Sequence, residues 1–328
     1  RFHGVGRFCV ATGEPVHPPQ LGFSDVFGEA LCRMAEREPR IVAVTAAMRG
    51  GTGLDGFAQR FPARFFDVGI AEGHAVTMAA GMAKQGMIPV FAVYSSFLQR
   101  AYDMLLHDAA IQKLHVVLAV DRAGLVGADG ETHHGVFDPG FLDTVPGMTI
   151  LCPSSYQELR TMLEYAVFRH RGPVAIRYPR GGEGTYRENA GLEPAIFLRE
   201  GSDITLVGYG TTVDPLLACA HRLSERKVEA EVVKLNRITP VPLEAISQSV
   251  KKTGRLLVAE ECAPSNSVGM RLSAGLLARG VPVKRLALAD TGPSFVTHGT
   301  VEQLRRLCGL DAGSLYQRAL EVCGCGDG

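Results

Sequence analysis

The densest group of titratable side chains lies in residues 121–135, directly after an apolar run of strand length. Four glycines separate these side chains, and glycine reaches backbone conformations that other residues avoid. A loop with only a structural role rarely needs so many titratable groups beside such a backbone, so we interpret it as part of a substrate site. Its acidic, basic and imidazole members are Asp121, Arg122, Asp129, Glu131, His133 and His134.

A carboxylate with a potential catalytic role is Glu72, which follows the predicted strand 65–68 and precedes a predicted helix over 75–84. Open α/β sheets bind their ligands at the carboxyl ends of the strands, which favours a functional Glu72. An acidic residue in a first helical turn is also stabilised by the helix dipole. Position alone leaves both interpretations open.

Two more strand ends carry candidate groups. The segment Tyr94–Arg100 offers aromatic rings and a cation, although a capped helix start with a buried Phe97 would explain the same residues. The segment Arg177–Gly182 brings two guanidinium groups, which suit bidentate contact with phosphate or carboxylate. A salt bridge between domains is the competing explanation for that segment.

Ten continuous apolar runs predict the strands that must position these groups. They do not alternate with polar residues, as is typical of parallel strands covered on both faces. Helical stretches separate them, and about two domains fit within 328 residues. The sequence therefore predicts an α/β fold with two consecutive domains and mostly parallel sheets. The runs are 41–45, 65–68, 90–94, 116–120, 149–152, 174–178, 204–207, 228–233, 256–259 and 283–288.

Glycine, proline and charge mark the domain boundaries. Residues 1–20 are predicted to be a linker arm, 21–185 the first domain, 186–194 a linker and 195–328 the second domain. Since the Gly208–Gly210 turn carries no cluster of titratable groups, we expect the second domain to contribute mainly to dimer packing.

Composition excludes several classes of protein. Thirty-four basic residues balance 34 acidic ones, so no overall field attracts nucleic acid. No apolar stretch approaches the ~20 residues needed to cross a membrane. The eight cysteines form no CxxC pair, which is typical of reduced thiols in a cytoplasmic protein. A chain that opens with Arg1 instead of Met is interpreted as a fragment or a subunit.

These segments together resemble the 1-deoxy-D-xylulose-5-phosphate synthases of the transketolase superfamily. The resemblance covers most of the chain and corresponds to the family's last two domains, a transketolase-like pyrimidine-binding domain and a transketolase C-terminal-type domain. Its most specific part is the run Arg122–His133. The other matching segments are 3–5, 67–72, 94–103 and 177–181.

The resemblance implies condensation of pyruvate with glyceraldehyde 3-phosphate, which forms 1-deoxy-D-xylulose 5-phosphate and carbon dioxide. This product is a precursor for isoprenoids, thiamine and pyridoxal. The cofactor would be thiamine diphosphate with Mg²⁺. Glu72 matches the catalytic glutamate that bonds N1′ of the aminopyrimidine and favours its reactive tautomer. Phe97 matches the aromatic residue stacked on the pyrimidine, and Arg100 and His3 match further residues of the cofactor site.

The resemblance also implies an acceptor site. Tyr94, Arg122 and Arg180 match groups that hold the phosphate of the aldehyde, where two cations suit a dianion. Asp129 and His133 match groups near the reacting carbons, and His133 would transfer protons and stabilise the pyruvate adduct.

The chain departs from the family in three respects. Gly73 and His134 stand where glutamine is usual, and we expect them to tune the pocket without removing its chemistry. The first domain of the family, which binds Mg²⁺ and the diphosphate, has no counterpart here, so no metal ligand is predicted in this chain. That domain would come from the same polypeptide or from a second chain, and a homodimer is expected.

Two other hypotheses stay open. A β subunit of a 2-oxo-acid dehydrogenase joins the same two domain types, although the Arg122–His133 loop argues against it. A truncated, non-catalytic interaction module would keep the same motifs if the truncation were recent.

Overall fold

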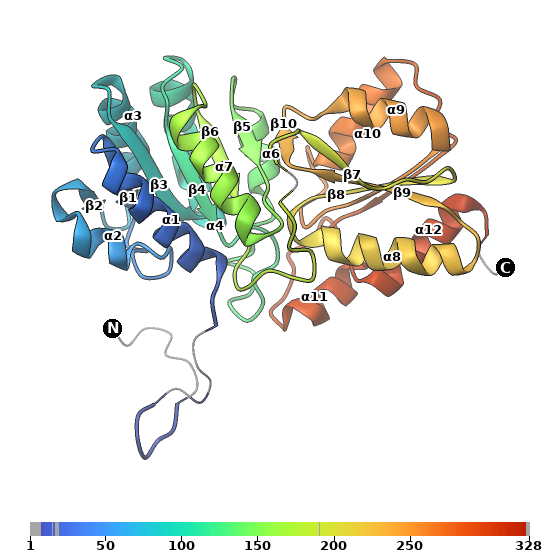
Figure 1. The fold of residues 1–328 in the computed structure, drawn as a ribbon, viewed down its shortest axis with the longest axis horizontal. Helices are drawn as coiled ribbons and strands as arrows, with labels where there is room; N and C mark the ends of the chain where they lie inside the picture. Colours follow the sequence, from blue (N-terminus) through green and yellow to red (C-terminus); the bar gives the residue numbers. More distant parts are fainter. Residues whose placement is uncertain (1–7, 15, 17–19, 190, 326–328) are drawn as a thin grey trace.

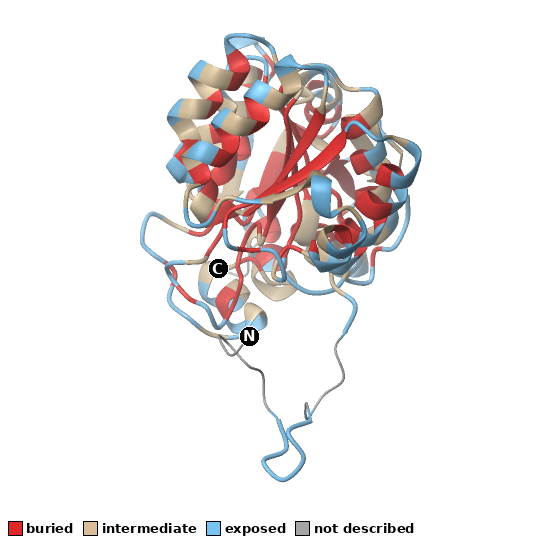
Figure 2. Cartoon of the chain, turned by 90° about the vertical axis from the view of Figure 1, so that its left-hand side faces the viewer, coloured by how far each residue is buried: buried red, intermediate tan, exposed pale blue. Residues whose placement is uncertain are grey.

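The computed structural model describes residues 8–14, 16, 20–189 and 191–325, which form two α/β domains side by side (Figure 1). His3 therefore lies outside the described residues. The central strands of the first domain are buried, and the helices that cover them turn their buried residues inward (Figure 2). Within the described part of the chain, no helix is both long and apolar enough to cross a bilayer.

The first domain is built on a sheet with the strand order β10-β5-β6-β4-β3-β1-β2. Strands β1 to β6 are parallel, and β1 and β4 are buried along their whole length. This pattern explains why their sequences are continuous apolar runs. The six strands are β1 (Ile41–Thr45), β2 (Phe65–Asp67), β3 (Ile88–Tyr94), β4 (Val117–Asp121), β5 (Thr149–Leu151) and β6 (Val174–Arg177).

Helices cover both faces of this sheet. One apolar core joins the sheet to α1 (Phe23–Arg37), α2 (Asp55–Arg60) and α7 (Tyr156–Phe168). The core on the opposite face includes α3 (Glu72–Lys84) and α6 (Asp138–Asp143). That core also includes the irregular helical segment α4 (Ser95–Leu98), η2 (Gln99–Ala101), α5 (Tyr102–Met104) and the π-helical η3 (Leu105–Ala110). Short π-helical stretches are frequent near functional sites.

The second domain has a five-stranded sheet with the order β12-β11-β8-β9-β7. Helices α8 (Val213–Glu225) and α12 (Ala312–Cys323) cover one face, and α9 (Leu243–Thr253) and α10 (Val268–Ala278) cover the other (Figure 1). Helix α11 (Val301–Cys308) lies toward the first domain. The parallel strands are β8 (Ile204–Gly208), β9 (Ala230–Leu235), β11 (Arg255–Ala259) and β12 (Arg285–Ala289).

The predicted α/β fold with two mostly parallel sheets is confirmed, but two strands were not predicted. Strand β7 (Ala195–Arg199) pairs antiparallel with β9. Strand β10 (Arg237–Thr239) follows β9 in sequence, yet it pairs antiparallel with β5 in the sheet of the first domain. The region assigned to the second domain thus donates an edge strand to its neighbour.

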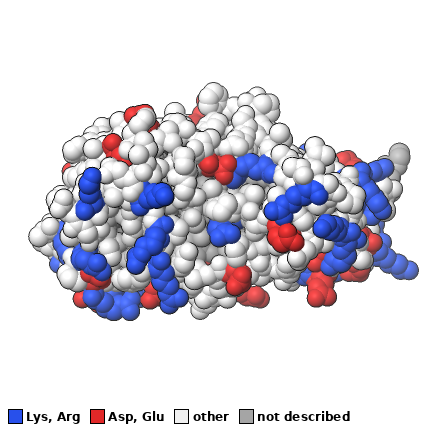
Figure 3. Space-filling view, turned by 90° about the horizontal axis from the view of Figure 1, so that it is seen from above, with Lys and Arg blue, Asp and Glu red and all other residues white. Residues whose placement is uncertain are grey.

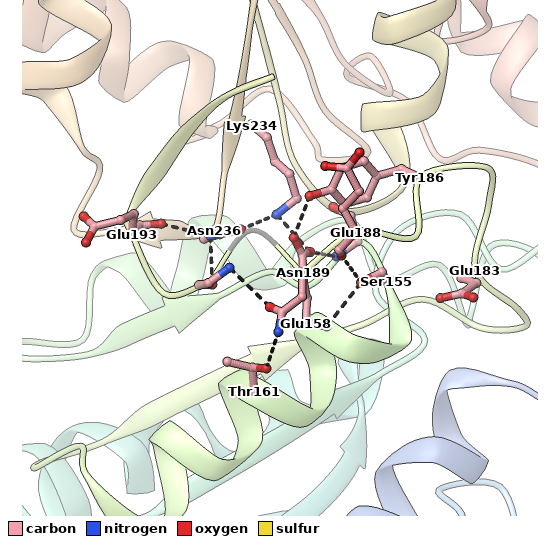
Figure 4. Close-up of polar contacts among 12 residues, drawn as sticks. Ser155, Glu158, Thr161, Glu183, Tyr186, Glu188, Asn189, Glu193, Lys234 and Asn236 are labelled. Carbon is pink, nitrogen blue, oxygen red and sulfur yellow. Dashed lines mark hydrogen bonds and ion pairs between the residues drawn. The ribbon is translucent and has the colours of Figure 1, made fainter. Parts of the chain in front are cut away.

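A buried polar cluster joins the domains beneath their connecting segment (Figure 4). The Lys234 ammonium of β9 lies 2.9 Å from the Glu158 carboxylate of α7, and both side chains are fully buried. Glu158 also accepts a hydrogen bond from the Tyr186 hydroxyl at 2.9 Å. The Asn236 amide donates to the Glu193 carbonyl at 2.9 Å. The cluster therefore connects the first domain, the linking segment and the second domain through buried polar contacts.

Charge on the molecular surface is mixed. Seen from above, Lys and Arg side chains alternate with Asp and Glu across both domains (Figure 3). This mixture of signs on the face shown matches the zero formal charge of the chain.

Candidate functional site

The predicted candidate residues come together at the carboxyl edge of the first sheet. Glu72 follows β2, Tyr94 ends β3, Arg122 follows β4, and Arg180 lies three residues beyond β6. Adjacent parallel strands end on the same side of a sheet, so residues far apart in sequence meet at this edge.

Glu72 lies five residues beyond the end of β2 and is the first residue of helix α3. Its side chain is only 3% exposed, and its Oε1 accepts a hydrogen bond from Arg100 Nη1 at 2.6 Å. The Arg100 guanidinium in turn lies 4.7 Å from the centre of the Phe97 ring. A buried carboxylate, a cation and an aromatic face therefore form one continuous wall.

The Phe97 ring connects this wall to residues 121–135, which we call the glycine-rich loop. Its centre lies 5.3 Å from that of the His133 imidazole, which meets it edge-on, and 5.9 Å from that of Tyr94. The Nδ1 atom of His133 lies 2.8 Å from the Thr132 hydroxyl. One imidazole nitrogen is thus oriented by its neighbour in the loop.

Two guanidinium groups converge on one carboxylate oxygen. Asp129 Oδ2 accepts hydrogen bonds from Arg122 Nη1 at 2.9 Å and from Arg180 Nη1 at 2.6 Å. The Arg122 guanidinium lies 3.9 Å from the centre of the Tyr94 ring, a cation–π contact. Burial raises the pKa of the Tyr94 phenol, so it stays protonated at neutral pH. Two guanidinium groups that converge on one oxygen, one of them above a neutral ring, suit a phosphate group.

Close backbone approach shapes the site at two glycines. A Cβ atom at Gly51 would lie 1.7 Å from the Tyr94 hydroxyl oxygen, so only glycine leaves room for that ring. In the glycine-rich loop, Gly124 adopts φ +83° and exchanges two backbone hydrogen bonds with Gly135, at 2.7 and 2.8 Å. This pairing closes the base of the loop.

A cavity of about 430 Å³ lies against the wall formed by Phe97 and Arg100, and its lining includes Thr132 and Phe295. A second cavity of about 570 Å³ shares Phe295 and extends toward Phe141 and Pro264. Phe97 and Arg100 line the first cavity, and Arg100 binds the Glu72 carboxylate, an arrangement that suits a pyrimidine ring. Within the described residues no cluster of His, Cys, Asp and Glu could hold a metal ion. The chain therefore fits the pyrimidine part of thiamine diphosphate, and its described residues offer no such ligand set for Mg²⁺.

The two positions that depart from the family pattern are both packed. A Cβ at Gly73 would lie 2.8 Å from the Met104 methyl carbon, so the helix start is close to its neighbour. His134 is buried, with Nδ1 at 3.1 Å from the Val126 amide and Nε2 at 3.0 Å from the Thr297 carbonyl.

The two arginines of the segment after β6 differ in their environments. Arg177 is 5% exposed and forms a bidentate ion pair with the fully buried Asp138, at 2.8 and 3.2 Å. Asp138 also accepts from the Ser95 hydroxyl at 2.8 Å, and Arg177 donates to the Gly135 carbonyl at 3.1 Å. Arg177 therefore holds the start of α4 and the base of the glycine-rich loop. Sequence reasoning missed this cluster because Asp138 carries no local motif.

The second domain also contacts the glycine-rich loop, a role that sequence reasoning did not predict. Glu261, two residues beyond β11, accepts a hydrogen bond from the Leu125 amide at 2.9 Å. The same carboxylate pairs with Arg305 of α11 at 2.7 Å. The acidic pair at 260–261, at the carboxyl end of a predicted strand, was the available signal.

Comparison with known proteins supports this architecture. The family model "Transketolase, pyrimidine binding domain" matches residues 20–182, and "Transketolase, C-terminal domain" matches residues 194–315. A solved structure titled "Split gene transketolase, inactive beta4 tetramer" is 26% identical, with a TM-score of 0.84 over 94% of this chain and 100% of that one. A Pichia stipitis transketolase mutant shares the fold at 13% identity, with a TM-score of 0.76 over 94% of this chain and 46% of that one. The chain belongs to the transketolase family.

Within this family, the chain resembles one group of transferases. It is 43% identical to 1-deoxy-D-xylulose-5-phosphate synthase of Carboxydothermus hydrogenoformans, over 98% of this chain and 52% of that protein. It is 47% identical to 1-deoxy-D-xylulose-5-phosphate synthase 1 of Geobacter sulfurreducens, over 96% of this chain and 50% of that protein. The predicted resemblance to transketolase-type transferases is confirmed, and the chain spans about half the length of these relatives.

Proposed function

We propose that this chain supplies the pyrimidine-binding and C-terminal domains of a 1-deoxy-D-xylulose-5-phosphate synthase. The complete enzyme would join pyruvate to glyceraldehyde 3-phosphate and release the carboxyl carbon of pyruvate as carbon dioxide. A domain that binds Mg²⁺ and the diphosphate of thiamine diphosphate would complete the site. It would belong to the same polypeptide or to a second chain.

One observation carries this proposal: an unbroken series of contacts joins the two halves of the site. It runs from Glu72 through Arg100 to Phe97, at 2.6 and 4.7 Å. From Phe97 it continues through Tyr94 to Arg122, at 5.9 and 3.9 Å. A cofactor held by the first group therefore lies beside an acceptor held by the second.

Glu72 would bind N1′ of the pyrimidine and hold a proton there. Its burial excludes water, and Arg100 fixes the orientation of the carboxylate at 2.6 Å. Phe97 would stack on the ring. Thiamine diphosphate, when bound, supplies the nucleophilic carbon that attacks the ketone of pyruvate.

Arg122 and Arg180 would bind the phosphate of the acceptor aldehyde, and the Asp129 carboxylate occupies their donor atoms in its place. Since both carboxylate and phosphate are anions, the substrate would displace this internal partner. His133 lies against Phe97, close to the cofactor wall, where it would exchange a proton with an oxygen of the reacting carbons.

The partner domain and the assembly belong to the same proposal. The split-gene transketolase chain, matched over its whole length, is described as inactive in its β4 form. We accordingly expect this chain to lack activity by itself and to become active with the cofactor-binding domain, as a homodimeric synthase.

The test is carbon dioxide release from pyruvate by the complete enzyme, with glyceraldehyde 3-phosphate as acceptor. Glu72→Gln should abolish most of this activity, whereas Glu244→Gln, at a carboxylate of the second domain that is 71% exposed, should retain it. Near-normal activity of Glu72→Gln would refute the role of Glu72. Consumption of a lipoyl protein in place of the aldehyde would instead favour a 2-oxo-acid dehydrogenase subunit.

A further inference from the structure

The conformation of the glycine-rich loop depends on contacts with the second domain. Within it, residues 122–135 carry the proposed acceptor site, and we call this part of the glycine-rich loop the acceptor loop. Glu261 is 3% exposed, and its Oε2 accepts the Leu125 amide at 2.9 Å while its Oε1 accepts Arg305 Nε at 2.7 Å. This carboxylate is therefore held by α11 of its own domain and presented to one peptide group of the first domain.

A second contact holds the next peptide group. His134 Nδ1 lies 3.1 Å from the Val126 amide, so that nitrogen accepts and the other carries the proton. The Nε2–H group then donates to the Thr297 carbonyl of the second domain at 3.0 Å. The Val126 carbonyl in turn accepts from Arg180 Nη1 at 3.3 Å. The backbone of Leu125 and Val126 thus connects the second domain to Arg180, one of the two arginines proposed to bind phosphate.

The backbone of the acceptor loop packs closely against the second domain, so the loop has little room to move there. A Cβ at Gly124 would lie 2.3 Å from Glu261 Oε2, and one at Gly127 would lie 3.2 Å from the Gly299 carbonyl oxygen. A small apolar core also crosses the boundary. It contains Leu125, Val136, Val296 and Leu304.

We propose that Glu261 is a positioning residue that makes the second domain a determinant of acceptor specificity. By fixing the Leu125 amide, three residues from Arg122, it sets the separation at which the Arg122 and Arg180 guanidinium groups meet. Their convergence on a single oxygen of Asp129 shows that this separation matches one small anion. This inference rests on the proposed function, because it assumes that the anion is the phosphate of the acceptor.

A neighbouring carboxylate provides a matched control. Glu260 is also fully buried, and it accepts hydrogen bonds from the Val268 and Gly269 amides and the Tyr209 hydroxyl, at 3.0, 2.8 and 2.9 Å. All three donors lie in the second domain. Loss of this carboxylate should disturb the second domain without releasing the acceptor loop.

The experiment compares kcat/KM for glyceraldehyde 3-phosphate with kcat/KM for unphosphorylated glyceraldehyde in the complete enzyme. In Glu261→Ala we expect this ratio to fall roughly tenfold or more, because charge-assisted phosphate contacts are weakened. Activity with glyceraldehyde should change little. Glu261→Gln, which keeps an acceptor for the Leu125 amide, should restore part of the ratio. Glu260→Ala should leave the ratio unchanged even where it lowers the melting temperature.

An unchanged ratio in Glu261→Ala, or an equal fall in Glu260→Ala, would overturn the proposal. If Glu261→Ala does not fold, Arg305→Met provides a second variant, since it removes only the partner that holds Glu261. If the parent enzyme does not use glyceraldehyde 3-phosphate, the proposed function fails. Binding of inorganic phosphate then tests the inference separately, and equal affinity in the parent and in Glu261→Ala would refute it.

Discussion

Removing the Asp138 carboxylate should destabilise the first domain strongly. Asp138 is fully buried and accepts three hydrogen bonds, two from Arg177 and one from Ser95. In Asp138→Ala the Arg177 guanidinium, only 5% exposed, would remain charged without its carboxylate partner. Breaking a buried ion pair from one side costs about 3–5 kcal/mol because the remaining charge is uncompensated. The ratio of folded to unfolded protein should fall by roughly 10²- to 10⁴-fold.

The double variant Asp138→Ala/Arg177→Met separates lost charge pairing from lost packing. It removes both charges, so it should be more stable than Asp138→Ala although it has one more substitution. Urea unfolding followed by far-ultraviolet circular dichroism suits this chain, which has no tryptophan. As a control, Glu29→Ala, in a side chain that is 56% exposed, should change stability by less than about 0.5 kcal/mol.

Two results would refute this reasoning. If Asp138→Ala unfolds within about 1 kcal/mol of the parent, Arg177 finds other compensation and the ion pair is not essential. If the double variant is no more stable than Asp138→Ala, the loss comes from packing around the site and not from an unpaired charge.

Three further predictions concern Asp121, Asp129 and Gly51, which lie near Tyr94 and Arg122 in the candidate site. Burial raises the pKa of the Asp121 carboxyl to about 7, so the stability linked to its proton is present at low pH and is lost as the pH rises toward 7 and above. The melting temperature of Asp121→Asn should therefore rise relative to the parent between pH 5 and pH 8, and a constant difference would contradict this. Asp129→Ala removes the carboxylate that competes for both guanidinium groups, so calorimetry should show inorganic phosphate binding up to about fivefold more tightly; weaker binding would assign Asp129 a direct role in holding the anion. Gly51→Ala places a methyl group 1.7 Å from the Tyr94 hydroxyl oxygen, and the displaced ring should raise KM for the phosphorylated acceptor while leaving cofactor affinity unchanged.

Much of the fold was predictable because parallel strands buried on both faces leave continuous apolar runs, as in Val116–Val120, which β4 largely covers. Strand β10 was not, since three residues of the sequence Arg-Ile-Thr carry no period, and their pairing with β5 depends on the packing of the two domains. Strand β7 was also missed; it is a partly exposed edge strand of the second sheet, directly after the predicted linker, and pairs antiparallel with β9.

The candidate site was predictable where the rule of strand ends applied, as for Glu72 and Arg122. Contacts between segments that are distant in sequence could not be predicted in this way. The Glu261–Leu125 hydrogen bond joins residues 136 positions apart, and neither residue carries a motif that identifies the other. Arg177 and Arg180 belong to one short motif, yet one is buried against Asp138 and the other reaches Asp129. Only the three-dimensional arrangement of their partners distinguishes them.

Strand β10 limits where a gene for this kind of protein can be divided. A break at the junction of the two domains would remove the antiparallel neighbour of β5 and leave an open edge that invites aggregation. It would also separate Lys234 from Glu158 and leave each of these buried charges without its ionic partner. The two domains are therefore expected to stay in one polypeptide, and the split-gene transketolase chain, matched over 100% of its length, aligns with 94% of this chain.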